Sequence, residues 1–71
     1  MNLFDVVIGK EYIIKSIETN DEELNSFLFS LGCYVGEPIT VIMRRRSNCT
    51  IALKEARYNI DKNLALKIIV G

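Results

Sequence analysis

Short apolar runs interrupted by polar turns occupy most of the chain, and only residues 21–31 repeat their apolar positions at helical spacing. Residues 11–17, which are rich in β-branched side chains, predict one strand. Pro38 introduces a second strand over 39–43, because a residue without an N–H fits best at the first position of a strand. A third strand over 49–54 follows after a short polar connection, so these two strands predict a hairpin.

The periodicity also predicts which side chains share a face and how the chain closes. On the second strand, one side consists of Ile39, Val41 and Met43. A turn at Glu55-Ala56 leads into a short run over 57–60. Residues 61–66 then predict one helical turn capped by Asp61, and 67–70 predict the last strand.

Residues 21–31 predict the one long helix. The apolar positions fall at i, i+3, i+4 and i+7, and they are Leu24, Phe27, Leu28 and Leu31. Asn20 with Glu23 predicts a capping box at its start. Gly32 predicts its end, because glycine adopts the left-handed conformation at low cost.

These elements predict a mainly β protein, a small closed barrel with one inserted α-helix at about residues 21–31 and a short helical turn near residues 61–66. With 71 residues, of which 49% are hydrophobic, we expect a single domain spanning 1–71 with enough apolar surface for one core. Closure into a barrel would remove the free strand edges that a short β protein otherwise exposes.

The order of motifs resembles one known family. Residues 28–36 read L-F-S-L-G-C-Y-V-G, which gives L-x-x-L-G-x-x-x-G followed by a strand, and the closing stretch 65–70 reads A-L-K-I-I-V. This order is similar to that of the FeoA family of ferrous iron transport accessory proteins over residues 3–70, nearly the whole chain. The resemblance implies an SH3-like β-barrel with an inserted helix.

The resemblance also implies a function. It indicates a non-enzymatic accessory protein of a bacterial ferrous iron uptake system. Such a protein binds or regulates the cytosolic part of a FeoB-type membrane transporter. The partner surface would belong to the G-protein domain or to the membrane part of that transporter. Its location would be cytoplasmic or peripheral at the inner face of the membrane. The alternatives are an SH3-like nucleic-acid-binding module and a stand-alone relative of the C-terminal domain of metal-dependent repressors.

Composition argues against several other classes of function. The net charge is zero, so the excess of basic residues that grips nucleic acid is absent and no nucleic acid partner is expected. The chain has no histidine, so we expect no catalytic site, no metal site and no cofactor. No export signal or membrane-length apolar span is visible, so we expect no stable membrane insertion, and we interpret Cys33 and Cys49 as reduced core residues.

The candidate partner-binding residues lie in two stretches and are Leu28, Phe29, Tyr34, Arg44, Arg45 and Arg46. Phe29 points away from the apolar face of the helix, and with Tyr34 it would form a small aromatic anchor of the kind that dominates interface energetics. The competing interpretation packs Phe29 under a loop, holds Leu28 in the core, and leaves the arginines as a solvated hairpin tip. Self-association of so apolar a chain stays open.

Overall fold

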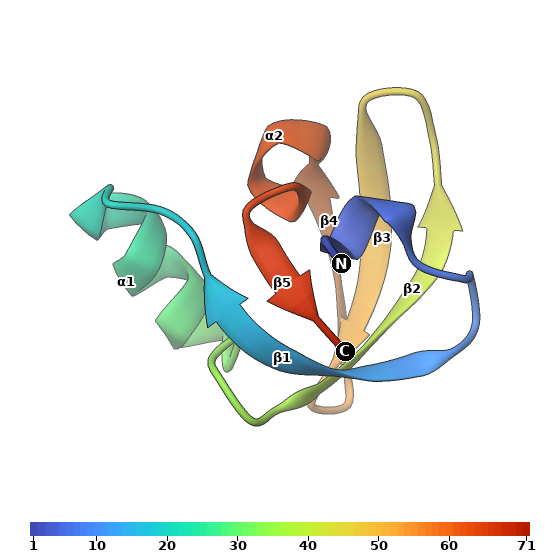
Figure 1. Cartoon of the computed structure of the whole chain (residues 1–71), viewed down its shortest axis with the longest axis horizontal. Helices are drawn as coiled ribbons and strands as arrows, with labels where there is room; N and C mark the ends of the chain where they lie inside the picture. The colour runs from blue at the N-terminus through green and yellow to red at the C-terminus, as the bar shows by residue number, and fades with distance from the viewer.

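The computed structural model describes all residues, 1–71, and shows five strands wrapped around an apolar interior, with one longer helix standing beside them (Figure 1). In chain order the elements are the 3₁₀ helix η1 (Leu3–Asp5), β1 (Glu11–Ile17), α1 (Glu22–Leu31), β2 (Pro38–Arg44), β3 (Asn48–Leu53), β4 (Ala56–Asp61), α2 (Lys62–Ala65) and β5 (Ile68–Val70). The expected mainly β fold with one long helix and a short helical turn is confirmed.

All neighbouring strands are antiparallel, and their order across the sheet is β4-β3-β2-β1-β5. The long strand β1 has two partners: its first half pairs with β2 and its second half with β5. A register shift between Ile14 and Ser16 separates the two halves. Because a bulge sharpens the local twist, β1 curls there and brings β5 over the interior (Figure 1).

The two chain ends meet at this closing strand. Met1 and Val70 are joined twice, since the Val70 N–H donates to the Met1 carbonyl at 2.8 Å and the Met1 ammonium donates to the Val70 carbonyl at 3.1 Å. The next residue, Asn2, caps η1 by accepting from the N–H groups of Phe4 and Asp5. The apolar pattern did not predict η1, because this single turn depends on a side-chain cap and not on periodicity.

The core lies between the strands and under the two short helices. Its fully buried large aliphatic side chains come from every strand but β4, from η1 and the residue after it, and from α1: Leu3, Val6, Ile14, Leu28, Ile39, Val41, Ile51, Leu53, Ile68 and Val70. The alternation predicted for the second strand fails near its end. Met43 is 45% exposed, because a register shift between Val41 and Met43 breaks the alternation of β2 before it reaches that residue.

The start of α1 differs by one residue from the predicted capping box. Asp21, and not Asn20, is the cap: its carboxylate accepts from the N–H groups of Glu23 at 2.9 Å and Leu24 at 3.2 Å. A charged carboxylate also interacts favourably with the positive end of the helix dipole, which a neutral amide does not do to the same extent.

The helix is attached to the barrel by a narrow stripe. Leu28 is fully buried, whereas Leu24 and Leu31 are half-buried against the core. Phe27, predicted on the same apolar face, is 49% exposed. The barrel surface covers only a small arc of α1, and Phe27 lies outside that arc.

The last hairpin turns at Lys54-Glu55, one residue earlier than predicted, and both residues are left-handed with φ of 50° and 69°. The predicted helical turn after β4 is α2, and Asp61 caps it as expected by accepting from the Leu64 N–H at 2.7 Å. No helix of the structure has the length and apolar character needed to cross a membrane.

Candidate partner-binding surface

Phe29 and Tyr34 form an exposed aromatic pair at the end of α1. Their ring centroids are 5.2 Å apart and the rings are tilted by 39°. Phe29 is 68% exposed, and Tyr34 is half-buried. The two residues that the sequence placed on a partner-binding surface are therefore brought together, and Phe29 does not pack under a loop.

The chain reversal at Gly32 produces this pairing. Gly32 is left-handed, with φ of 89°. Its N–H donates to the carbonyls of Leu28 and Phe29 at the end of the helix. The Cys33 N–H then donates to the Leu28 carbonyl at 2.9 Å, which completes the tight C-terminal turn of the helix. Because the chain doubles back here, Tyr34 returns to the side of the helix that carries Phe29.

A charged pair frames Tyr34 on its other side. Lys54 Nζ lies 3.0 Å from Glu37 Oε1 and 5.2 Å from the centroid of the Tyr34 ring. The Glu37 carboxylate, which hydrogen-bonds to Lys54, raises the pKa of that ammonium, and Tyr34 contributes in the same direction. The charged Lys54 ammonium thus lies between the Glu37 carboxylate and the Tyr34 ring.

Gly32 leaves room for the stem of Lys54, which a larger residue would force to move. A Cβ at position 32 would lie 2.5 Å from Lys54 Cδ and 2.7 Å from Cε. The lysine stem thus crosses directly over the Gly32 backbone to reach Glu37. Gly32 at the helix end and Lys54 in the hairpin turn are far apart in the sequence. Together they form the surroundings of the Tyr34 ring.

Leu28, the remaining candidate in this stretch, lies in the core. It is 1% exposed, so its side chain cannot touch a partner while α1 is folded. Its assignment to the partner-binding surface is wrong, and the core interpretation holds. The reason is positional, because a residue at the centre of the narrow attached stripe of α1 faces the barrel.

Both cysteines are buried and unpaired. Burial raises the pKa of the Cys33 thiol to about 11. Burial also raises the pKa of the Cys49 thiol, and the nearby Arg44 charge opposes that effect. Neither thiol is a nucleophile near neutral pH, since the thiolate is the reactive form. The expectation that they are small core residues is confirmed.

The three arginines lie at the far end of the molecule from α1, around the tip of the β2–β3 hairpin (Figure 1). Arg44 is engaged: its guanidinium donates to the carbonyls of Val6 at 2.7 Å and Phe4 at 3.1 Å. Arg45 and Arg46 are exposed and make no ion pair, since the one ion pair of the structure is Lys54–Glu37. The arginines and the aromatic pair are therefore two separate surfaces.

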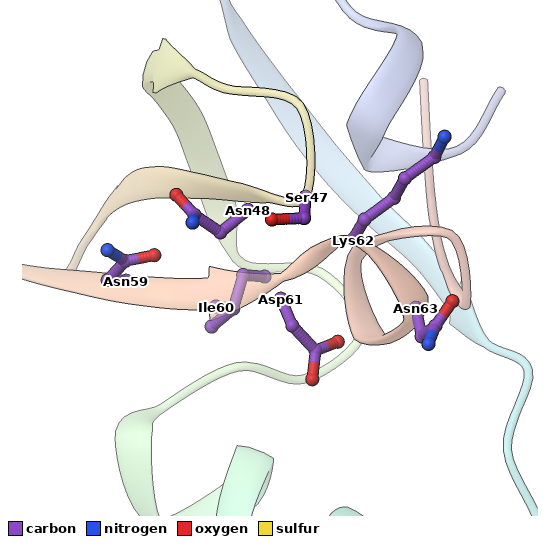
Figure 2. A pocket seen from close by; sticks show the side chains of 7 residues that line it. All are labelled: Ser47, Asn48, Asn59, Ile60, Asp61, Lys62 and Asn63. Carbon is purple, nitrogen blue, oxygen red and sulfur yellow. The ribbon is translucent and has the colours of Figure 1, made fainter.

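Sequence reasoning missed a polar hollow of about 510 Å³ beside α2 (Figure 2). Its lining comes from the hairpin tip, β4 and α2, and consists of Ser47, Asn48, Asn59, Ile60, Asp61, Lys62 and Asn63. No local motif could have revealed it, because its lining combines residues 47–48 with residues 59–63, which meet only in the fold. Figure 2 shows the Asp61 carboxylate and the amides of Asn48 and Asn63 pointing in different directions, so they do not converge on one ligand atom.

The structure contains no group of three or more His, Cys, Asp or Glu side chains close enough to hold a metal ion. The acidic stretch at the start of α1 has an ordinary structural role, because the Asp21 carboxylate caps the helix and Glu22 and Glu23 lie in its first turn.

Comparison with known proteins gives a consistent result. The model of the FeoA domain matches residues 1–71. No curated protein sequence matches the chain significantly. FeoA domains are small accessory domains and not a known enzyme family.

Three solved structures share the fold. An iron uptake regulatory protein, FeoA, is 24% identical with a TM-score of 0.88, over 99% of this chain and 93% of that one. Zinc-complexed FeoA from Stenotrophomonas maltophilia, described as a procaryotic SH3 domain protein, is 14% identical with a TM-score of 0.86, over 100% of this chain and 89% of that one. A manganese-dependent transcriptional repressor is 19% identical with a TM-score of 0.89, over 99% of this chain, which spans 40% of the repressor. The expected SH3-like barrel is thereby confirmed.

Proposed function

The chain belongs to the FeoA domain family, and we propose on that basis that it is a non-enzymatic accessory protein of ferrous iron uptake. In this proposal, residues 1–71 act as one FeoA-like domain that binds or regulates the cytosolic part of a FeoB-type membrane transporter. Iron is the cargo of the transporter and is not held by this chain. The protein would then work in the cytoplasm at the inner face of the membrane.

The observation that carries the proposal is the aromatic pair of Phe29 and Tyr34. An aromatic side chain that is 68% exposed on a small domain loses apolar contact with water when a partner covers it. Aromatic anchors of this kind supply much of the binding free energy of protein interfaces. Lys54 and Glu37 add a polar rim with a fixed geometry, which would favour one orientation of the partner.

The test is a binding titration of the protein against the FeoB-type transporter from the same cell, in detergent, with and without guanine nucleotide. We expect saturable binding that Phe29→Ala weakens at least tenfold, which corresponds to the roughly 1.4 kcal/mol or more that an anchor residue contributes. Dependence on the nucleotide would indicate that the G-protein domain is the regulated part.

Phe27→Ala is the matched control, because Phe27 is also an exposed phenylalanine on α1 but lies outside the aromatic pair. It removes the same side chain from the same helix and should leave binding unchanged. Equal weakening by both variants would show that the partner covers the outer face of α1 as a whole and not the aromatic pair in particular. No binding under either nucleotide condition would refute the transporter as partner.

A second candidate function is supported by the likeness to the manganese-dependent repressor. In that case the domain would work by contact within a regulatory assembly or on nucleic acid. Binding to DNA or RNA that falls steeply with salt would favour it, because phosphate contacts release counterions. The net charge of zero argues against direct reading of nucleic acid.

A further inference from the structure

Two exposed aliphatic residues lie at the end of the molecule opposite α1. Val7 is 62% exposed and Ile8 is 46% exposed, in the loop between η1 and β1 (Figure 1). The loop is not free, because the Gly9 N–H donates to the Val41 carbonyl at 2.9 Å and the Val7 N–H donates to the Tyr12 hydroxyl at 3.1 Å. The fold therefore holds apolar side chains outward beside β2.

The arginines border this loop. Arg44 links the two segments, since its guanidinium donates to the carbonyls of Phe4 and Val6 just before the loop. At the hairpin tip, the Arg45 N–H donates to the Asn48 carbonyl at 2.8 Å, so the backbone of the tip is ordered while the side chains of Arg45 and Arg46 stay exposed. We call the surface made by Val7, Ile8, Met43, Arg45 and Arg46 the arginine end.

Charge is separated along the molecule even though the net charge is zero. The acidic run Asp21, Glu22 and Glu23 begins α1, at the opposite end from the hairpin tip (Figure 1). Asp5 and Asp61 lie near the tip and keep their negative charges, since Asp5 accepts from the neutral Asn2 amide and Asp61 from a backbone N–H. They are outnumbered there by Arg44, Arg45, Arg46 and Lys62. A negatively charged flat surface would therefore orient the protein with the arginine end toward it.

We propose that the arginine end docks reversibly on an anionic lipid bilayer. Basic side chains next to a membrane gain free energy from the negative surface potential, about fivefold in partition for each arginine. Apolar side chains held beside them can enter the headgroup region and lose contact with water. Val7, Ile8 and Met43 supply those side chains, and Arg45 and Arg46 supply free positive charge.

Lipid fits the arginine end better than nucleic acid does. Single-stranded nucleic acid is held by exposed aromatic rings on which the bases stack. The aromatic residue nearest these arginines, Phe4, is half-buried, and both Arg44 and Lys62 already lie over its ring, at 6.0 and 5.3 Å. Exposed aliphatic side chains offer no stacking surface but do suit a membrane interface. This proposal does not depend on the transporter contact, because pure lipid is the expected ligand.

The experiment is co-sedimentation of the whole protein with vesicles of phosphatidylcholine, with and without phosphatidylglycerol. We expect binding only to the vesicles with phosphatidylglycerol, and weaker binding as salt screens the charges. Arg45→Glu with Arg46→Glu should lower the partition at least about 25-fold, from two arginines at about fivefold each. Val7→Ser with Ile8→Ser should lower it about tenfold with the charge unchanged.

The matched control is Lys15→Glu with Arg57→Glu, which makes the same change in net charge at exposed positions outside the arginine end. It should leave most of the binding intact. Equal loss in both charge-reversed variants would overturn the proposal, since net charge alone would then explain the binding. Absence of binding to anionic vesicles would overturn it too, and tighter, salt-sensitive binding to a short RNA would assign the arginine end to nucleic acid instead.

Discussion

The barrel and helix α1 are attached to the core to very different extents. Each strand but β4 buries at least two side chains almost completely, and the strands bond to one another along their length. Of the ten residues of α1, only Leu28 is buried. The stability of the protein therefore resides mainly in the barrel, and α1 presents side chains to the outside. A helix with one anchor can tolerate changes on its outer face that a strand of the barrel cannot.

The largest loss of stability is expected inside the barrel. Ile51 is fully buried on β3 and lies between Val41 of β2 and Tyr58 of β4. Ile51→Ala should lower the free energy of unfolding by about 2–5 kcal/mol, from lost burial and the cavity left behind. Because so small a domain has little stability in reserve, urea unfolding followed by circular dichroism should show a large unfolded fraction. A loss below about 1 kcal/mol would mean that β3 is not central to the core.

Leu28→Ala tests the anchor of the helix. We expect a loss of about 2–3 kcal/mol, near the lower end for a buried leucine, because α1 is attached to the barrel by a narrow stripe and can settle into the space. Hydrogen exchange should show lost protection of the α1 amides while the amides of β2 and β3 stay protected. A uniform loss in every element would show instead that helix and barrel unfold as one unit.

The pKa of the Cys33 thiol depends on how well the junction between α1 and the barrel excludes water. This pKa is raised from 9.0 to about 11 in the folded state, so the folded protein keeps a proton that the unfolded chain releases between those values. The protonated Cys33 thiol therefore contributes on the order of 2 kcal/mol to the free energy of unfolding below about pH 9. This contribution is lost as the pH rises toward 11.

The measurement is urea unfolding of the wild type and Cys33→Ala from pH 8 to 11. Other groups titrate in the same range, and the alanine variant retains all of them, so the difference in slope isolates this thiol. Parallel curves would show that Cys33 is solvated in the folded state.

Gly32→Ala and Gly36→Ala separate a backbone cost from a side-chain cost. Both glycines are left-handed, with φ of 89° and 94°, so each change should cost about 1–2 kcal/mol. A Cβ at Gly32 also displaces Lys54, whereas one at Gly36 meets nothing within 4 Å. Thermal unfolding should therefore show the larger loss of stability for Gly32→Ala. In NMR spectra, the resonances of the Tyr34 ring should shift in that variant alone. Equal effects on Tyr34 would contradict the contact.

The smallest expected effect is at the start of α1. Asp21→Ala should cost about 1 kcal/mol, because two N–H groups lose their acceptor, while Asn20→Ala should change the stability very little. Thermal unfolding of the two variants decides between them. A reversed order would restore the predicted capping box at Asn20.

The sequence predicted the elements well and the tertiary detail less well. The bounds of β1 and the role of Pro38 follow from local rules, so they were predictable. The exposure of Phe27 and Met43 was not, because it depends on how much of α1 the barrel covers and on a bulge in β2. Periodicity marks an apolar face but not the width over which a neighbour covers it.

The candidate surface was predictable in part for the same reason. Helical geometry alone placed Phe29 away from the apolar stripe, and Gly32 implied the reversal that brings Tyr34 beside it. The contact of Lys54 with Tyr34 was not predicted, because Lys54 reaches the ring from the turn between β3 and β4. The hydrogen bonds of Arg44 to the carbonyls of Phe4 and Val6 could not be predicted either, since residues about 40 positions apart meet only once the strands have assembled.

The turn at Lys54-Glu55 has a consequence for engineering. A two-residue hairpin turn with both residues left-handed is most favourable as Asn-Gly, so a redesign for heat tolerance would replace both residues here. That exchange would remove the side chain that joins Glu37 to Tyr34 and uncover the backbone at Gly32. Replacing Glu55 alone with glycine would relax half of the turn and leave this framework in place. At Lys54, a change that favours heat tolerance would therefore damage the candidate partner-binding surface. At Glu55, heat tolerance can be improved without touching that surface.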